Sequence, residues 1–166
     1  MNLLKRLLET YEYRIDFKKY WKRRLFIQSQ PSNFLCVGIK MYYLIWLKRQ
    51  ESKFGATTGT GIGTVSSPCC QFHEPVFFPH GLSGIVIARN VVFEGKATVY
   101  QHVTIAEEDR NSQSFIGEGT VIGTGAVILN NVKIGRNVKI DANAVVTKDI
   151  PDNTTVIGIP AQVVEH

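Results

Sequence analysis

The sequence predicts a mainly β protein in which a short α-helical segment precedes a three-sided parallel β-helix. Three observations lead to this prediction. From Ile116 to Pro151, an Ile or Val recurs at every sixth residue. The residue four places after each of these is Thr, Ala, Val or Ile. The same six-residue period runs upstream through Ile87, Phe93, Val99 and Ile105.

The length of the period determines the expected shape. A period of six matches neither the 3.6 residues of a helical turn nor simple strand alternation. It fits a triangular coil of about 18 residues, with one hexad on each side. The first residue of each hexad then points inward, and equivalent residues stack at about the 4.8 Å spacing of neighbouring strands. The fifth residue lies near a narrow corner, and Gly or Asn between them permits turns with positive φ.

Two breaks in the period predict loops. The step from Phe78 to Ile87 is 9 residues, an insertion of three, and the step from Ile105 to Ile116 is 11, an insertion of five. The polar segment 107–114 spans this second break, and we expect it to be an exposed loop. Insertions in a repeat protein form loops, and loops commonly carry function.

The charge of the chain is uneven. Residues 1–54 hold 12 Lys or Arg against 4 Asp or Glu, a net charge of +8, whereas the remainder holds 7 against 10, a net charge of −3. Helical spacing of apolar residues predicts one or two amphipathic helices over 2–29 and another over about 33–53. Residues 1–54 are therefore expected to be a basic helical segment, 55–76 a linker or degenerate first coil, and 77–166 the β-helix.

The apolar run from Phe34 to Leu47 has two interpretations. Its fourteen residues are too few to span a bilayer. It packs on the base of the β-helix or on a partner subunit, or it rests with the neighbouring cations on an anionic membrane. No nucleic-acid-binding motif accompanies the basic charge, so we expect no nucleic-acid partner.

The three cysteines, Cys36, Cys69 and Cys70, are odd in number and lack the spacing of metal ligands. This favours a reducing cytoplasm. The charged, helical start does not look like a signal peptide. We therefore expect a cytoplasmic protein, with the inner face of the membrane as its location if the basic helices bind lipid.

Three motifs are similar to those of a known family. They are the stretches Phe78–Ile87, Gln101–Ile105 and Asp149–Ala161. Over about residues 77–164 the chain resembles the hexapeptide-repeat acyltransferases, in particular the serine acetyltransferases and their sugar O-acetyltransferase relatives. The resemblance implies a left-handed β-helix, a homotrimer, and acetyl-CoA as a co-substrate with no permanently bound cofactor.

The resemblance also implies a catalytic histidine. Acetyl transfer to a hydroxyl needs a base, and imidazole suits this role because its ordinary pKa is about 6.5. His80, within the three-residue insertion, matches the catalytic position of the family. His102 is the second candidate catalytic residue: it lines an acceptor pocket, or it only occupies a corner. Glu74 is a candidate to orient an imidazole.

For the acyl donor, the resemblance implies coenzyme A in a groove between coils. Its pantetheine arm would bond to the backbone at Gly123, Thr124, Gly125 and Ala142, where small side chains allow close approach. Lys148 or Lys139 would meet a phosphate. Alternatively, the glycines and alanine serve only to form coil corners.

The expected acceptor is a hydroxyl of a sugar or of a surface-polysaccharide precursor. Relative to the serine enzymes, the acidic partner expected near Val65 is missing, and residues 111–114 replace a second histidine. The alternatives are serine O-acetyltransferase of cysteine biosynthesis and a non-catalytic assembly protein. A γ-carbonic anhydrase is disfavoured because His73, His80 and His102 lack the spacing of its three zinc ligands, so no metal site is expected.

Overall fold

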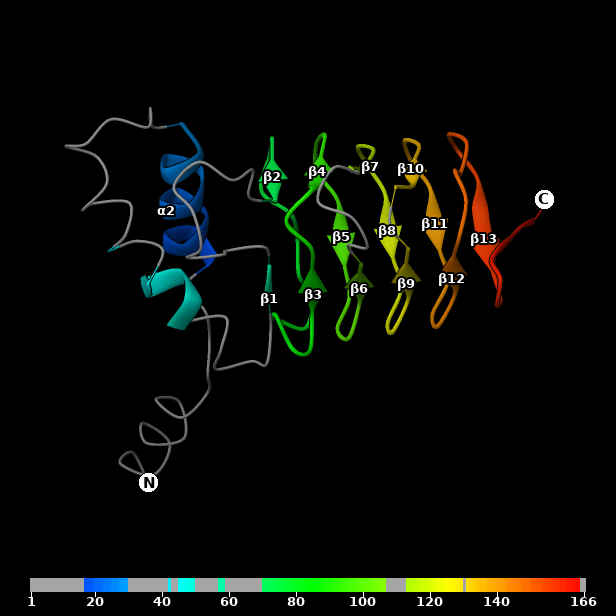
Figure 1. Cartoon of the computed structure of the whole chain (residues 1–166), viewed down its shortest axis with the longest axis horizontal. Coiled ribbons are helices and arrows are strands. Elements are labelled where there is room, and N and C mark those ends of the chain that lie inside the picture. The colour runs from blue at the N-terminus through cyan, green and yellow to red at the C-terminus, as the bar shows by residue number, and fades with distance from the viewer. Residues whose placement is uncertain are drawn as a thin grey trace, which may run out of the picture.

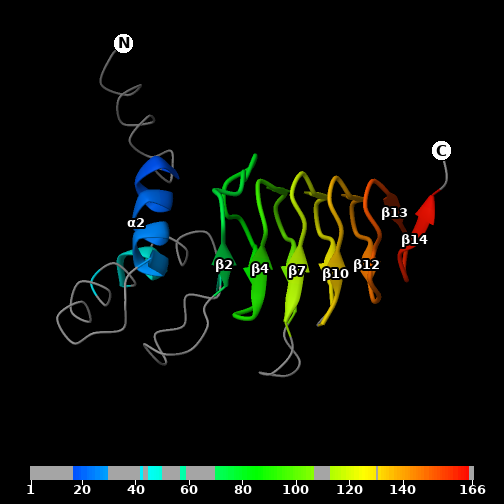
Figure 2. The ribbon, with the colours of Figure 1, turned by 90° about the horizontal axis from the view of Figure 1, so that it is seen from above.

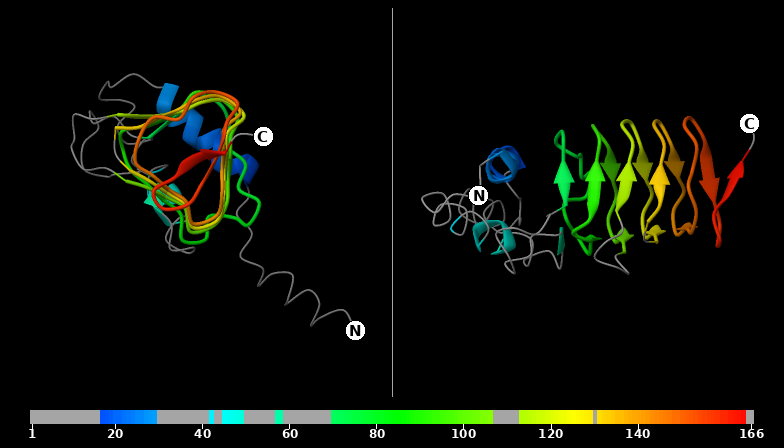
Figure 3. Two further views of the ribbon diagram at one scale, coloured as in Figure 1. Left: turned by 90° about the vertical axis from the view of Figure 1, so that its right-hand side faces the viewer. Right: turned by 45° about the horizontal axis from the view of Figure 1, so that its top comes forward.

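The computed structural model describes residues 17–29, 42, 45–49, 57–58, 70–106, 113–129 and 131–164. Its strands wind into a three-sided prism, and the helix α2 (Phe17–Ser29) lies at the N-terminal end of that prism (Figure 1). Figure 2 shows the same stack of coils from above. The view along the long axis shows the triangular cross-section directly (Figure 3).

Each side of the prism is one sheet. Face A contains β1 (Thr57–Thr58), β3 (Val86–Ile87), β6 (Thr104–Ile105), β9 (Val127–Ile128) and β12 (Val145–Val146). Face B contains β2 (Gln71–Phe72), β4 (Val91–Phe93), β7 (Ser114–Ile116) and β10 (Lys133–Ile134). Face C contains β5 (Thr98–Val99), β8 (Val121–Ile122), β11 (Lys139–Ile140), β13 (Thr155–Ile157) and β14 (Gln162–Val164).

Neighbouring strands pair in parallel, except that β14 returns antiparallel to β13 at the C-terminal end. The register confirms the coil length, since Val121 pairs with Lys139, 18 residues later. The strands β1 and β2, from the segment 55–76, pair in parallel with β3 and β4.

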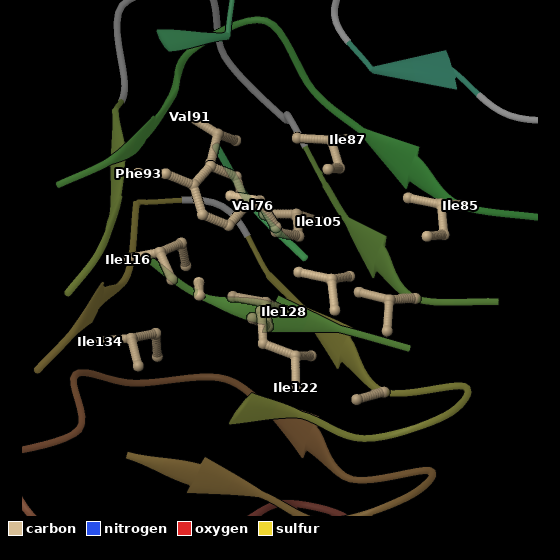
Figure 4. Packing of buried hydrophobic residues seen from close by; sticks show 14 of the residues in the cluster. Val76, Ile85, Ile87, Val91, Phe93, Ile105, Ile116, Ile122, Ile128 and Ile134 are labelled. Carbon is tan, nitrogen blue, oxygen red and sulfur yellow. The ribbon is translucent and has the colours of Figure 1, made fainter. Parts of the chain in front are cut away.

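The hexad pattern is confirmed by burial. The first residues of the hexads are at most 3% exposed and form an inward stack, namely Ile87, Phe93, Val99, Ile105, Ile116, Ile122, Ile128, Ile134, Ile140 and Val146. Figure 4 shows several of these side chains projecting into the same interior. The fifth residues are buried as well, including Ala126 and Ala144 at 0%. Burial of this continuous apolar core holds successive coils together.

The corners of the prism use the left-handed backbone conformation that the sequence predicted. At the corner from face C to face A, hereafter the C–A corner, one residue of each coil has positive φ: Gly84, His102, Gly125 and Asn143, with φ of 61°, 59°, 69° and 57°. Gly and Asn tolerate this region more readily than other residues. Its positive φ identifies His102 as a corner residue, and histidine is unusual at such a position.

The expected loop over 107–114 needs one correction. Residues 107–112 lie outside the described part of the chain. Ser114 is not in an exposed loop: it belongs to β7, is 2% exposed, and pairs with Val91. Its hydroxyl oxygen accepts a hydrogen bond from the Val132 amide at 3.3 Å. A small hydroxyl side chain fits this inward position because the next coil offers it a donor.

The helix α2 closes the N-terminal end of the core. Trp21 is 7% exposed, and its ring centroid lies 5.0 Å from that of Phe72 and 6.1 Å from that of Phe78. The guanidinium of Arg24 lies 4.5 Å from the Phe72 ring centroid. Leu47, in the helical residues 45–49, is fully buried in the same cluster. A β-helix needs such a cap because its terminal coil would otherwise expose apolar core.

In the described ranges, no helix has the length and apolar character needed to cross a membrane. Of the expected helix over 2–29, the structure describes 17–29. Of the one over 33–53, it describes 42 and 45–49, all helical. The remaining residues of both predictions lie outside the described residues.

Candidate active site

The three-residue insertion forms a loop with buried anchors and an exposed tip. Phe78, Leu82 and Ile85 are 3%, 0% and 0% exposed and fix the loop to the core. His80 lies between them and is exposed. Gly81 turns the chain with φ of 70°, and its amide donates to the Phe78 carbonyl at 3.1 Å. The loop thus holds an imidazole outside the core, and buried residues on both sides of the imidazole anchor the loop.

The His80 ring contacts the next coil at the C–A corner. Its Nδ1 lies 2.7 Å from Oε1 of Gln101, within hydrogen-bond distance. The ring of Tyr100 meets it edge-on, with centroids 5.7 Å apart and planes at 89°. Gln101 belongs to the motif Gln101–Ile105, but that motif alone assigns no role to its side chain. The signal was present, since one coil of about 18 residues plus the insertion of three places His80 above Gln101.

His102 follows Gln101 directly and is exposed. Its amide donates to the Ser83 carbonyl at 2.9 Å, so it supports the far end of the His80 loop. Its ring lies against Gly84, where a Cβ would collide with Nδ1 of His102. His102 therefore occupies a corner and helps to shape the loop.

Glu74, the candidate to orient an imidazole, has a different partner. Its carboxylate lies 3.8 Å from the Lys96 ammonium, with both side chains well exposed. The group that the structure places on His80 Nδ1 is the neutral amide of Gln101.

The candidate donor-binding residues lie along the same C–A corner. Thr124 and Gly125 follow one coil after Gln101, whose carbonyl accepts a hydrogen bond from the Gly125 amide at 3.0 Å. Ala142 and Asn143 follow one coil further, and the Asn143 amide donates to the Thr124 carbonyl at 2.8 Å. The predicted catalytic and donor-binding positions are thereby brought into one column.

The backbone at this corner is partly occupied. The Gly123 amide donates to the Ile140 carbonyl at 2.8 Å, and the Gly125 amide is used by Gln101. Gly123 is needed for close packing, because a Cβ there would come 2.7 Å from the Ala142 nitrogen. Of the four backbone amides at the candidate donor-binding residues Gly123, Thr124, Gly125 and Ala142, those of Thr124 and Ala142 are therefore the better candidates to bind a ligand.

The lysines lie away from the column. Lys148 follows β12 at the other edge of face A, one hexad beyond Ala142, and Lys139 is on β11 of face C; both are exposed. A separate surface hollow of about 550 Å³ is lined by residues around β7 and β10, including Phe115, Lys133 and Asp149, and His80 is not among them. Within the described residues, no three His, Cys, Asp or Glu side chains gather as a metal group.

Comparison with known proteins agrees with this architecture. The profile of a family described as "Bacterial transferase hexapeptide (six repeats)" matches residues 114–148. The match shows that this stretch of the chain is similar to the hexapeptide repeats of that family. The region that the match covers contains β7 to β12, the most regular coils of the prism.

The curated relatives that match the chain are named serine acetyltransferases. The chain is 35% identical over 128 residues to a "Serine acetyltransferase" of Bacillus pumilus, an alignment covering 75% of this chain and 56% of the relative. The structure "Soybean Serine Acetyltransferase Complexed with Serine" matches with 27% identity and a TM-score of 0.64, covering 86% of this chain and 52% of that one.

A serine acetyltransferase of Brucella abortus in complex with coenzyme A has 27% identity and a TM-score of 0.64, covering 76% and 48% of the two chains. The chain thus spans about half the length of the relatives it matches. Its fold is the left-handed parallel β-helix: the six-residue period predicted the parallel coil, and the family resemblance implied its left hand.

Proposed function

We propose that this protein is an acetyl-CoA-dependent O-acetyltransferase with L-serine as its acceptor. The observation that carries the proposal is the column at the C–A corner. The exposed imidazole of His80 lies in contact with Gln101, and Thr124 and Ala142 follow on the next two coils. A base on the first of these coils and backbone amides on the next two would suit a thioester held along the corner, and this supports the proposal.

In the proposed reaction, His80 acts as general base. Nδ1 of its ring faces Gln101, so Nε2 takes the proton from the acceptor hydroxyl. The hydroxyl oxygen attacks the thioester carbonyl and forms the new C–O bond. The C–S bond then breaks, and the leaving thiolate takes the proton from the imidazolium. Direct transfer suffices because the thioester is already activated and both substrates are held together. Cys70 is fully buried, which makes it unsuited to act as a nucleophile.

The comparisons favour serine over the sugar acceptor that the motif departures suggested. The relatives that match this chain carry the name serine acetyltransferase, and one solved neighbour holds serine. Acetyl-CoA as donor is supported in the same way by the neighbour that holds coenzyme A. We include a cytoplasmic location in this proposal, because acetyl-CoA is supplied there.

A sugar hydroxyl is the second candidate acceptor, and one observation favours it. Among the described residues, the His80 ring contacts the amide of Gln101 and the phenol ring of Tyr100. A zwitterionic amino acid needs charged partners, whereas a sugar needs neutral hydrogen-bonding groups and aromatic surfaces.

The deciding experiment is an acceptor screen. Purified protein is incubated with acetyl-CoA and either L-serine or a panel of nucleotide-activated sugars, and thiol release is followed over time. Release with L-serine alone supports the proposal, and release with sugars alone replaces serine by the second candidate. No release with any acceptor, together with no thermal stabilisation by acetyl-CoA, contradicts the acetyltransferase proposal.

A further inference from the structure

The contact between His80 and Gln101 determines more than the position of the ring. The Nδ1–Oε1 distance of 2.7 Å is short for a hydrogen bond to a neutral amide. A carbonyl oxygen can only accept, so Nδ1 must carry the proton in this arrangement. The lone pair of the neutral ring is then at Nε2. The partner of one ring nitrogen thus fixes the state of the other.

We propose that Gln101 is the positioning residue of the active site: its side-chain carbonyl holds His80 as the Nδ1–H tautomer, so that Nε2 serves as the base. This inference rests on the proposed function, which assigns His80 as the base. It differs from an acid–histidine pair in that the orienting group is neutral. A carboxylate would stabilise the imidazolium with a full negative charge, whereas an amide carbonyl does so only with its weaker dipole.

The fold holds Gln101 from both sides. The amide of the preceding residue, Tyr100, donates to the Ile122 carbonyl at 3.0 Å, and the Gln101 carbonyl accepts from the Gly125 amide at 3.0 Å. The amide of the following residue, His102, donates to the Ser83 carbonyl at 2.9 Å. Gln101 is therefore connected to the coil that follows and, through its neighbour, to the loop that carries His80.

Tyr100 completes the positioning. Its ring meets the imidazole edge-on at 89° and limits rotation of the ring about its Cβ–Cγ bond. Tyr100 is also the titratable group in direct contact with His80 within the described residues. The nearest acidic residue upstream, Glu74, is paired with Lys96. The orientation of His80 thus depends on two neighbouring residues of one corner, of which Gln101 makes the hydrogen bond.

The test compares two substitutions at one position in the full-length chain. Gln101→Leu removes the acceptor at similar size, and Gln101→Glu restores it as a carboxylate. Gln71→Leu is the matched control, because Gln71 is an exposed glutamine on β2 of face B. The tautomer of His80 is read by ¹⁵N NMR of the imidazole, with the signal assigned by its absence in His80→Asn. Turnover is measured across pH with the acceptor found in the screen.

The expected results are as follows. Wild type and Gln71→Leu hold His80 as the Nδ1–H tautomer, and Gln101→Leu shifts it toward Nε2–H. In Gln101→Leu, kcat falls about 10–100-fold, the usual effect of removing an orienting partner, with the KM for acetyl-CoA unchanged. Gln101→Glu recovers most of kcat, and the acidic limb of its kcat/KM profile moves about one pH unit upward, because the added carboxylate stabilises the imidazolium.

Two results would overturn the inference. The first is an Nε2–H tautomer in wild type, which would mean that the Gln101 amide donates. The second is an unchanged tautomer in Gln101→Leu. Because NMR needs no turnover, failure of the proposed function appears separately: wild type without thiol release but with the expected tautomer change contradicts the acetyltransferase alone.

Discussion

His102 lies directly against Gly84, one coil apart on the C–A corner, and its ring occupies the space that a Cβ on Gly84 would need. Both residues have positive φ, and Gly84 ends the loop that carries His80. The small size of one residue and the ring of the other are therefore complementary. This relationship links a corner of the prism to the geometry of the candidate active site.

Gly84→Ala is expected to destabilise the protein and to lower its activity. At φ of 61° an alanine costs about 1–2 kcal/mol, and the new methyl group must also displace the His102 ring. The matched control is Gly81→Ala, which has φ of 70° but nothing within 4 Å of the added carbon. Thermal unfolding of both variants measures the difference. Equal loss of stability would mean that the His102 ring moves aside without cost.

His80→Ala is expected to reduce kcat by about 10²–10⁴-fold, the typical contribution of a positioned base. Acetyl-CoA binding should survive, because His80 is exposed at the loop tip and the loop is anchored by other residues. His73→Ala is the control, since His73 is also exposed and has no assigned role. Steady-state kinetics and acetyl-CoA titration distinguish the two variants.

His102→Ala is the comparison for His80→Ala and should have a smaller effect, mainly on the KM for the acceptor. If His102→Ala abolished turnover while His80→Ala left it nearly intact, the two roles would have to be exchanged. If both variants stayed active, neither imidazole would be the base.

Most of the prism could be predicted from the sequence because its core is periodic. Once Ile116 and Ile122 define the hexad, every inward position and the coil length follow. The corner role of His102 also follows from the period, since Gly125 and Asn143 occupy equivalent positions. Because each coil repeats the same pattern, one hexad predicts the equivalent positions of the other coils.

The contacts of the site could be predicted only in part. The period places His80 above Gln101, but it does not tell which of Gln101, His102 or Glu74 supplies the bond to the imidazole. That choice depends on loop geometry set by Gly81 and Gly84. The packing of α2 on the first coil lies outside the repeat, so no spacing rule relates Trp21 to Phe72.

A homotrimer remains our prediction for the assembly, and face A supplies a surface for it. Its outward residues Val86, Val127 and Val145 are in one register across β3, β9 and β12, with Thr104 between them, and Val86 is 41% exposed. Closed cyclic symmetry would cover this stripe. Light scattering should give about three times the chain mass of 18.6 kDa. Val127→Asp should lower that mass, whereas Val121→Asp on face C should not. A wild-type monomer at micromolar concentration would contradict the prediction.

Contact of the N-terminal cap with an anionic membrane is a separate prediction. Lys18, Lys19 and Lys22 on α2 are exposed, and Phe26 nearby is 39% exposed. Such a surface should bind vesicles that contain phosphatidylserine and release them at 1 M salt, where screening is nearly complete. Flotation of Lys18→Glu/Lys22→Glu should show loss of binding. The control Lys133→Glu/Arg136→Glu makes the same change of charge at β10 of the prism, away from α2. Equal binding to vesicles of pure phosphatidylcholine would rule this contact out.

Trp21→Ala is expected to lower both the stability of the protein and its kcat, although Trp21 lies outside the candidate active site. The Trp21 ring stacks nearly parallel to that of Phe78, at 5° and 6.1 Å, and Phe78 is the first buried anchor of the loop that carries His80. Removing a buried tryptophan typically costs about 3–5 kcal/mol, and here the cavity would open directly beneath that anchor. We expect a lower melting temperature and a lower kcat, with the KM for acetyl-CoA unchanged because Thr124 and Ala142 lie on more distant coils.

Trp46→Ala is the control, since Trp46 is only partly buried beneath the Arg23 guanidinium, 4.1 Å from its ring centroid. A destabilised Trp21→Ala that kept wild-type kcat below its melting temperature would mean that Leu82 and Ile85 alone suffice to hold the loop.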